Sequence, residues 1–392
     1  MTSRPIRVLH VITRMIVGGA QENTLLSCAL IDRARFPSTI LSGVETGAEG
    51  SLLDDCRARG VPVEFEPALV RELHPWNDVV ALFRLWRRFR RERWDVVHVH
   101  TSKAGIVGRL AAWLAGVPVV IHTAHGWAFS REQPAPVRAL YTFLERLCAV
   151  PCDAIVVVCE PDRVEALRLG IGRPSQYVMI RSGIEIEAYA RSSRTRLETR
   201  NALGISESAF VIGTVGRLTD QKAPLDLLQA FRRVAAARPE SHLVFVGDGP
   251  LKSEVEAAAR DAGLESRVHL LGLRRDVPDL LHAFDVFALS SRWEGLPRVF
   301  PQAMAASLPI VATRVVGAID AIVEGENGCL VEPGDVAALA ERLERLASDP
   351  DQRRRMGAAG QARVAEFSAE TMVRQLERLY ERHALTARGT NA

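Results

Sequence analysis

Short runs of β-branched and other apolar residues alternate with stretches of helical length along most of the chain. The first half contains RVLHVIT, STILSG, VPVEF, WDVVHVH, VPVVIHT and DAIVVVC, and the second contains AFVIGTVG, HLVFVG, RVHLLG, FDVFALS, LPIVATR and NGCLVEP. Strands that alternate with helices form βαβ units, and strands this apolar are buried on both faces of a sheet. The sequence therefore predicts an α/β fold of two Rossmann-like, doubly wound parallel-sheet domains that face a cleft, with helices at the C-terminus.

The boundary between the two halves falls in a polar, arginine-rich segment without a strand pattern, ARSSRTRLETR. A chain of 392 residues is long enough for two or three domains with cores of their own. We expect a first domain at residues 1–190, a linker at 191–207 and a second domain at 208–368. We also expect a helix at 369–385 that returns to the first domain, and a frayed tail at 386–392.

Composition and charge argue against several classes of function. The net charge is only +3, which gives no support for nucleic-acid binding. The six cysteines lack C-x-x-C spacing and histidine partners, so we expect reduced thiols, a cytoplasmic protein and no metal site. The longest apolar run, residues 110–121, is too short to span a bilayer and contains Gly116 and Pro118. We therefore predict no membrane span.

Parallel sheets bind ligands at the carboxyl ends of their strands, so the residues that follow each strand are candidate contacts. Gly18 and Gly19 precede a helix whose free N–H groups suit a phosphate, although a turn that needs glycine explains them equally well. The run is not G-x-G-x-x-G, which disfavours a dehydrogenase. His125 follows VPVVIHT and either touches a ligand or is held by a backbone carbonyl, whereas His122 is expected in the core.

Charged residues follow two strands of the second half. Arg217 and Lys222 come after AFVIGTVG and supply the charge and donors that bind a diphosphate, unless they are two solvated surface cations. Glu294 precedes a run that should begin a helix, and an amide, Gln302, stands eight residues later. These side chains are the candidate active site of the second half.

The order and spacing of VGRLTDQKAPLDLLQAF, VGDGP, LLG, SRWEG and ENGCLVEPGD resemble the nucleotide-sugar domain of glycosyltransferase family 4. GGAQ and HTAHG resemble the acceptor-side domain of the same family, whose members are retaining enzymes with the GT-B fold. The resemblance implies catalytic roles for Arg217, Lys222, Glu294 and His125. It implies donor contacts by Gly18, Gly19, Gly272, Leu273, Arg298, Val299 and Gln302.

The sequence departs from the family pattern at three places. Gln302 replaces the second glutamate of an E-x7-E pattern, which in the family holds the nucleotide ribose. RSGIE replaces a frequent Asn-Gly-Ile-Asp run, and Pro297 replaces a frequent glycine, which removes one backbone donor. An amide can accept from one ribose hydroxyl and donate to another, so the exchange should cost on the order of 1 kcal/mol of binding. We interpret the site as active.

The resemblance implies a retaining hexosyltransferase that moves a sugar from a nucleoside diphosphate sugar. We expect UDP as the nucleotide only because it is the more common donor nucleotide. It implies a glycan or lipid-linked acceptor in cell-surface polysaccharide assembly and neither a metal nor another cofactor. Two alternatives stay open: a sugar-nucleotide epimerase of the same architecture, and a non-catalytic sugar-nucleotide-binding protein. Product analysis with the donor alone separates the epimerase from the transferase.

Two features of the first half suggest how an acceptor could bind. The helix expected at 76–93 should bury Val79, Leu82, Phe83 and Trp86 and present a basic face of Arg84, Arg87, Arg88 and Arg91. That face is either solvated or a contact for anionic lipid, which would make the protein peripheral at the inner face of the cell membrane. Ser102 and Lys103 open another helix and either bind an acceptor phosphate or form an ordinary helix start.

Overall fold

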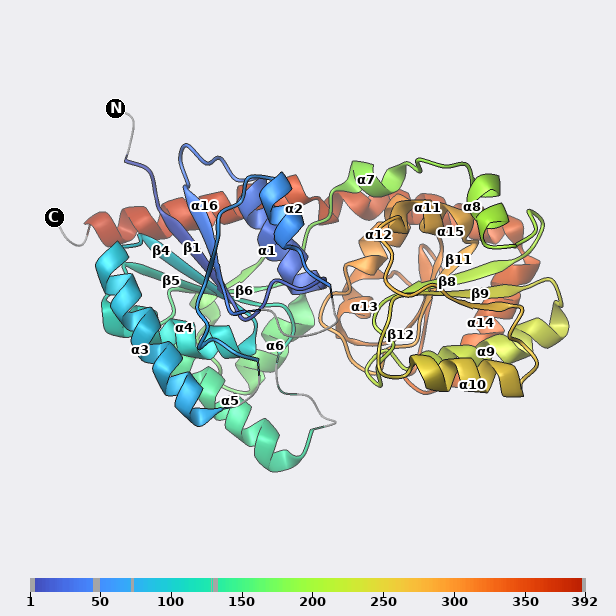
Figure 1. Ribbon diagram of the computed structural model, residues 1–392, viewed down its shortest axis with the longest axis horizontal. Helices are drawn as coiled ribbons and strands as arrows, with labels where there is room; N and C mark the ends of the chain where they lie inside the picture. Colours follow the sequence, from blue (N-terminus) through green and yellow to red (C-terminus); the bar gives the residue numbers. More distant parts are fainter. Residues whose placement is uncertain (1–3, 45–49, 72–73, 128, 130–132, 390–392) are drawn as a thin grey trace. The chain divides into compact units, whose positions relative to one another are not determined.

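The computed structural model describes residues 4–44, 50–71, 74–127, 129 and 133–389. The chain divides into two compact units, which are coloured from blue to red along the sequence in Figure 1. Unit 1 comprises Met1–Gly183 and Ala369–Ala392, and unit 2 comprises Ile184–Ser368. Each unit has its own parallel sheet with helices packed on it, so the predicted fold class of two doubly wound domains is confirmed.

The described residues of unit 1 form a seven-stranded sheet with the order β3-β2-β1-β4-β5-β6-β7, in which neighbouring strands are parallel. The strands are β1 (Val8–Ile12), β2 (Ser38–Ser42), β3 (Val63–Phe65), β4 (Val96–His100), β5 (Val119–Ala124), β6 (Ala154–Val157) and β7 (Tyr177–Met179). The strand order reverses between β1 and β4, which is where a doubly wound sheet binds ligands. The sequence did not predict β7, a short and partly exposed edge strand.

The helices of unit 1 are α1 (Gly19–Ala29), α2 (Leu53–Ala58), α3 (Pro75–Glu92), α4 (Ser102–Ala115), α5 (Ala135–Ala149), α6 (Glu160–Arg168) and α16 (Ala369–Gly389), with the 3-10 turn η1 (Pro174–Gln176). The apolar stripe of α16 joins the core, where Leu376 and Tyr380 lie among residues such as Val8 and Val96. The prediction of a frayed tail is wrong for residues 386–389, because Ala387 also packs against this core. Residues 390–392 lie outside the described residues.

The described residues of unit 2 form a six-stranded parallel sheet with the order β10-β9-β8-β11-β12-β13. The strands are β8 (Val211–Val215), β9 (His242–Val246), β10 (Val268–Leu270), β11 (Val286–Leu289), β12 (Ile310–Thr313) and β13 (Gly328–Val331). The helices are α7 (Ile186–Ala190), α8 (Arg196–Ala202), α9 (Pro224–Ala237), α10 (Lys252–Asp261), α11 (Val277–Ala283), α12 (Val299–Ala305), α13 (Val316–Ala321), α14 (Val336–Ser348) and α15 (Pro350–Arg363), with the 3-10 turn η2 (Val364–Phe367). Here the strand order reverses between β8 and β11.

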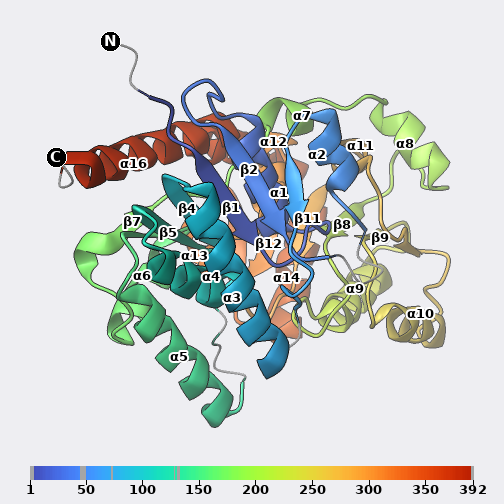
Figure 2. The same cartoon turned by 60° about the vertical axis from the view of Figure 1, so that its left-hand side comes forward.

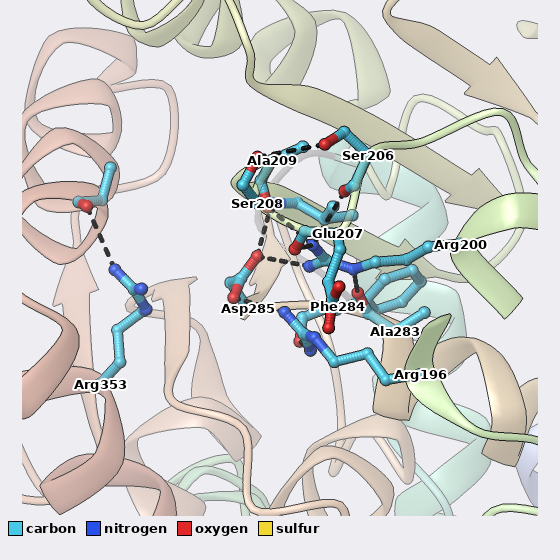
Figure 3. Close-up of polar contacts among 12 residues, drawn as sticks. Arg196, Arg200, Ser206, Glu207, Ser208, Ala209, Ala283, Phe284, Asp285 and Arg353 are labelled. Atoms are coloured by element: carbon cyan, nitrogen blue, oxygen red, sulfur yellow. Dashed lines mark hydrogen bonds and ion pairs between the residues drawn. The ribbon is translucent and has the colours of Figure 1, made fainter. Parts of the chain in front are cut away.

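The segment expected as a linker is part of unit 2. Residues 196–202 form α8, and Arg200 is 0% exposed although its sequence neighbourhood is polar. The guanidinium pairs with Asp285 at 2.8 Å, and Arg196 pairs with the same carboxylate at 2.6 Å (Figure 3). Arg200 also donates to the backbone carbonyls of Ala283, Glu207 and Ala209. The prediction of a linker was wrong because the local sequence does not show whether an arginine is solvated or is buried with partners such as these.

The residues that α3 buries also differ from those predicted. The fully buried residues are Ala81, Leu85 and Phe89, whereas Val79 is 59% exposed and Phe83 is 56% exposed. Leu82 and Trp86 lie between these two extremes. The helix therefore carries an exposed apolar stripe in addition to the buried one. No helix in the described ranges combines the length and the apolar character that a membrane span requires.

Candidate active site

The loops at the carboxyl edge of the unit 2 sheet are joined by backbone contacts. The N–H of Gly247, after β9, donates to the carbonyl of Gly272, after β10, at 2.8 Å. A Cβ atom on Gly247 would lie 2.1 Å from the carbonyl oxygen of Gly216, so only glycine allows the loops after β8 and β9 to approach this closely. This contact fixes the loop that carries Arg217, which is exposed, relative to the loop that carries Gly272 and the exposed Leu273.

The backbone at Lys222 is held by a buried serine and by an unusual conformation. The hydroxyl of Ser290, which follows β11, donates to the carbonyl oxygens of Lys222 and Ala223, at 2.9 Å and 2.8 Å. Ala223 precedes α9 with φ of 45°, a left-handed conformation that non-glycine residues rarely adopt. Strained backbone of this kind persists where surrounding contacts over-determine it, and it is common at active sites.

Two of the predicted catalytic side chains are in direct contact. Lys222 Nζ lies 2.5 Å from Glu294 Oε1, and the hydroxyl of Ser291 donates to the same carboxylate oxygen at 2.7 Å. Lys222 follows β8 and Glu294 follows β11, so this ion pair bridges the point where the strand order reverses. Both side chains are mostly sheltered from solvent. Sequence reasoning did not identify Ser291, which acts as a positioning residue for Glu294.

Gln302 has a partner that the sequence did not reveal. Its side chain lies on α12 and is 6% exposed, and its Nε2 donates to the hydroxyl of Tyr189 on α7 at 3.0 Å. No local signal could have indicated this contact, because 113 residues separate the two positions. Arg298 directly precedes α12 and is buried, and Val299 is the first residue of that helix. These three predicted donor contacts therefore lie together on one short segment of unit 2.

In unit 1, His125 stands at the end of a chain of hydrogen-bonded imidazoles. His125 Nε2 lies 3.1 Å from His100 Nδ1, and His100 Nε2 lies 2.9 Å from His10 Nδ1. Burial lowers the pKa of His10 to about 3 and holds the pKa of His100 well below its usual value. Both side chains are therefore neutral near pH 7. The alternation in VVHVH, which places His98 and His100 on one face of β4, was the signal for this chain that sequence reasoning missed.

The same histidines are the group in the described part of the chain whose spacing could suit a metal ion. Ring nitrogens of His10, His98 and His100 lie within 4.8 Å of one another. Both nitrogens of His98 are already engaged, one with the hydroxyl of Tyr380 and one with that of Thr123, each at 2.7 Å. Hydrogen bonding therefore accounts for both ring nitrogens of His98 without a metal, and the expectation that no metal or other cofactor is needed stays a prediction.

Described residues of unit 1 line at least two pockets. The histidine pocket has a volume of about 200 Å³ and is lined by Thr101, Ser102, His122, Thr123, Ala124, His125, Gly126, Trp127 and Glu145. The helix pocket has a volume of about 450 Å³ and is lined by Thr13, Arg14, Gln21, Arg71, Asp78, Val79, Leu82, Thr101, Ser102, Lys103, Ile106, Val107, Leu110, Tyr141 and Leu144. The predicted acceptor residues lie here, since Ser102 lines both pockets and Lys103 lines the second, where it pairs with Asp78 at 2.6 Å. Gly18 and Gly19 begin α1 and are not among these lining residues.

Known families match both halves of the chain. A family described as "Glycosyl transferases group 1" matches residues 195–363, and one described as "Glycosyl transferase 4-like domain" matches residues 18–183. A UDP-Gal:alpha-D-GlcNAc-diphosphoundecaprenol alpha-1,3-galactosyltransferase of Escherichia coli is 32% identical over 352 residues, which cover 89% of each protein. The capsular polysaccharide biosynthesis glycosyltransferase CapM of Staphylococcus aureus is 26% identical and covers 79% of this chain and 82% of CapM.

Solved structures agree with these sequence matches. HepE of Anabaena, crystallised in complex with UDP, superposes with a TM-score of 0.80 at 25% identity, covering 96% of this chain and 100% of HepE. WaaG, a glycosyltransferase involved in lipopolysaccharide biosynthesis, superposes with a TM-score of 0.76 at 16% identity, covering 96% of this chain and 99% of WaaG. The likeness to WaaG concerns the fold alone.

Proposed function

The chain belongs to the glycosyltransferase group 1 family, has a glycosyltransferase 4-like first domain and the GT-B fold, and we propose that it transfers a hexose from a UDP-sugar to a polyprenyl-diphosphate-linked glycan. The proposed reaction retains the anomeric configuration and belongs to cell-surface polysaccharide assembly. The UDP bound to HepE supports the donor, and the diphosphoundecaprenol acceptor of the relative from Escherichia coli supports the acceptor.

The observation that carries the proposal is the ion pair between Lys222 and Glu294. A sugar phosphate needs a cation beside its phosphate and a carboxylate beside its sugar hydroxyls, and these two groups are 2.5 Å apart at the ligand-binding edge of the sheet. When the donor binds, the ammonium group of Lys222 leaves the carboxylate of Glu294 and pairs with the donor diphosphate. Glu294 is then released to the sugar while Ser291 keeps it in position.

Arg217 and Lys222 would stabilise the negative charge that grows on the departing diphosphate. Preorganised cations at such a position are worth more in the transition state than in the ground state, which raises kcat. The guanidinium of Arg217 can bind two phosphate oxygens at once. We therefore propose a reaction that needs no metal. Gln302, together with the hydroxyl of Tyr189, would hold the ribose.

We place the membrane contact on apolar residues of unit 1 rather than on arginines alone. The apolar rim consists of exposed residues on α3 (Trp76, Val79, Phe83) and on α5 (Leu140, Phe143, Leu147). Several arginines of the basic face have acidic partners: Arg84 pairs with Glu66, Arg88 with Glu64 and Glu92, and Arg91 with Glu92. Arg87 is exposed beside them. An exposed apolar rim next to cations is the composition of an interfacial surface, and the proposed location is the inner face of the cell membrane.

Purified protein incubated with labelled UDP-sugars tests the proposal, with GlcNAc-diphosphofarnesyl and a free oligosaccharide as alternative acceptors. We expect release of UDP and an α-linked product on the diphosphofarnesyl acceptor from one α-configured UDP-hexose, with the same rate in EDTA. A β-linked product would contradict retention, and glycosylation of the free oligosaccharide alone would contradict the lipid-linked acceptor. An epimerised nucleotide sugar formed without any acceptor would replace the transferase with the epimerase.

A further inference from the structure

We infer that the helix pocket of unit 1 binds the diphosphate and the first isoprenoid units of the lipid-linked acceptor, an inference that rests on the proposed function. The pocket is formed mainly by α3, α4 and α5, which lie side by side in Figures 1 and 2. Its volume of about 450 Å³ falls within the usual range of small-molecule sites, which is roughly 300–1,000 Å³. A pocket of this size holds the start of a long lipid and not the whole of it.

The polarity of the lining changes along α4. Thr101, Ser102 and Lys103 lie at the N-terminal end of this helix, and Ile106 and Leu110 lie one and two turns further on. Because an α-helix rises 1.5 Å per residue, the polar end and Leu110 are separated by roughly 10 Å. A diphosphate joined to a hydrocarbon chain has the same change from charged to apolar along its length.

The described lining of the helix pocket contains more cations than carboxylates. The cations are Arg14, Arg71 and Lys103, and the carboxylate is that of Asp78, which pairs with Lys103. Arg14 is 7% exposed, and the Lys103 side chain is also mostly covered, so water screens their charge less than it screens a surface cation. Hydroxyl groups of Thr13 and Thr101, which lie 2.8 Å apart, add hydrogen-bonding capacity. Three cations and two hydroxyls suit a diphosphate better than they suit a neutral sugar.

The rest of the helix pocket is mostly apolar. Its apolar lining consists of Val79 and Leu82 from α3, Ile106, Val107 and Leu110 from α4, and Tyr141 and Leu144 from α5. A glycan bound here would leave its hydroxyl groups without partners, whereas a hydrocarbon chain gains by leaving water. Val79 belongs both to this pocket and to the exposed apolar rim. The lipid therefore passes from the pocket over the rim to the membrane.

The position of the histidine pocket indicates the orientation in which the acceptor binds. The histidine pocket shares Thr101 and Ser102 with the polar end of the helix pocket and contains His125. A lipid-linked sugar whose diphosphate lies at these shared residues therefore has its sugar beside His125 and its lipid between α3 and α5. The order of the groups in the molecule, sugar, diphosphate and lipid, matches the order of the two pockets.

The test compares two acceptors that carry the same GlcNAc-diphosphate, one ending in methyl and one in farnesyl, in detergent without vesicles. In Leu110→Asp and in Ile106→Asp, the ratio of kcat/KM for the farnesyl acceptor to that for the methyl acceptor should fall on the order of ten-fold. Arg71→Ala should raise KM for both acceptors by a similar factor and leave this ratio unchanged. The matched control is Val164→Asp, since Val164 is an exposed valine on α6 outside the pocket lining.

The ratio of kcat/KM for the farnesyl and methyl acceptors distinguishes a failure of the helix-pocket inference from a failure of the proposed function. Wild-type protein that prefers the farnesyl acceptor, together with Leu110→Asp and Ile106→Asp variants that keep the wild-type ratio, overturns the helix pocket and leaves the proposed function standing. Wild-type protein that glycosylates neither diphosphate acceptor while it consumes the donor with another acceptor overturns the proposed function itself. Thermal unfolding reports the folding of each variant, because the substituted residues lie in unit 1 and UDP binding would report on the donor residues of unit 2.

Discussion

The two units have the same kind of scaffold but place different chemistry at their strand ends. In unit 2, the point where the strand order reverses carries two opposite charges in contact, Lys222 and Glu294. In unit 1, the corresponding strands β1 and β4 carry His10 and His100, which burial keeps neutral. Charged groups suit the stabilisation of a leaving diphosphate, and neutral imidazoles suit hydrogen bonding to hydroxyl groups.

The outer surfaces of the units differ in a second way. Helices α3 and α5 of unit 1 expose large apolar side chains such as Trp76 and Phe143. In the described part of unit 2, side chains of this kind lie on α8 and α13, for example Leu197 and Ile319, and not on α9, α10 or α14. The central strands of both sheets are buried, as in β1 and β11, so the difference concerns what each unit contacts and not how it folds. The contrast agrees with the proposed function, in which unit 2 binds a soluble nucleotide and unit 1 contacts a lipid.

The largest expected effect concerns the charged pair. Lys222→Ala and Glu294→Gln should each lower kcat far more than they raise the KM for the donor, by roughly 3–4 kcal/mol of barrier, since both groups act on charge that develops in the transition state. Steady-state kinetics with the diphosphofarnesyl acceptor measure this loss. Lys252→Ala is the matched control, because Lys252 pairs with Asp248 in the same unit, away from β11. Turnover near the wild-type value in both active-site variants would remove the assignment.

The next effect concerns the membrane-facing surface of unit 1. Phe143→Ser combined with Leu147→Ser should weaken binding to anionic vesicles by about 2–3 kcal/mol, because two exposed apolar side chains no longer enter the lipid. Vesicle co-sedimentation measures this change, and activity on the methyl acceptor should stay at the wild-type level.

Replacement of Arg87 and Arg91 by glutamate provides the electrostatic comparison. The effect should be smaller than that of the apolar variant and should fade with added salt, since Arg91 is already paired with Glu92. A larger and salt-dependent effect of the arginine variant would mean that the basic face, and not the apolar rim, is the main contact.

Stability should fall in acid because of the neutral histidines. The folded-state pKa values of His10, His98, His100 and His122 are all lowered, mainly by burial. The unfolded state therefore binds more protons below pH 6.5, so this stability is fully present above pH 6.5 and is lost as the pH falls towards about 3. Asp162, whose pKa is raised to about 6 by burial, opposes the trend. We expect Tm to drop by roughly 5 °C between pH 7 and pH 5.

The variant His10→Gln tests this interpretation. It keeps a hydrogen-bond donor but cannot titrate, so the dependence of Tm on pH should become shallower. A pH dependence that is unchanged in His10→Gln, or a Tm that rises in acid, would contradict the assignment of this loss to the buried imidazoles.

The smallest expected effect concerns Gln302. Gln302→Ala should mainly raise the KM for the donor, as expected when a contact made equally in ground and transition states is removed. Gln302→Glu should change binding by about 1 kcal/mol at most, because the hydroxyl of Tyr189 can turn to donate to a carboxylate. Donor titrations measure both variants, with Tyr189→Phe as the companion. A large loss of kcat in Gln302→Glu would show that the amide has a role of its own.

The sequence predicted the buried parts of both units well, for a physical reason. Strands covered on both faces are continuous apolar runs, and β8 to β13 lie where such runs occur. Lys222 was a candidate because it follows a strand and parallel strands bring their carboxyl ends to one edge, whereas the role of Glu294 was implied by the family resemblance. Only β7, which is short and partly exposed, lacks this signal among the described strands.

Contacts between distant residues could not be predicted in the same way. Arg200 looked like a linker residue because its partner Asp285 is 85 residues away. In α3, both Ala81-Leu85-Phe89 and Val79-Phe83 have helical spacing, so periodicity alone cannot decide which stripe is buried. Periodicity placed Val79 and Phe83 in the core, whereas both are exposed and belong to the proposed membrane contact.

The imidazole chain that ends at His125 has one further consequence. Among the described residues, the Nε2 atom of His10 is buried without a hydrogen-bond partner. In protein interiors, a buried N–H without an acceptor is rarer than a buried acceptor without a donor. His10 therefore carries its hydrogen on Nδ1 and donates it to His100. His100 in turn donates from Nδ1 to His125, which must then be the Nδ1–H tautomer. His10, a residue of β1, thereby determines that Nε2 is the nitrogen of His125 that keeps a lone pair. The hydrogen bonds of the chain all run in the same direction, from His10 through His100 to His125.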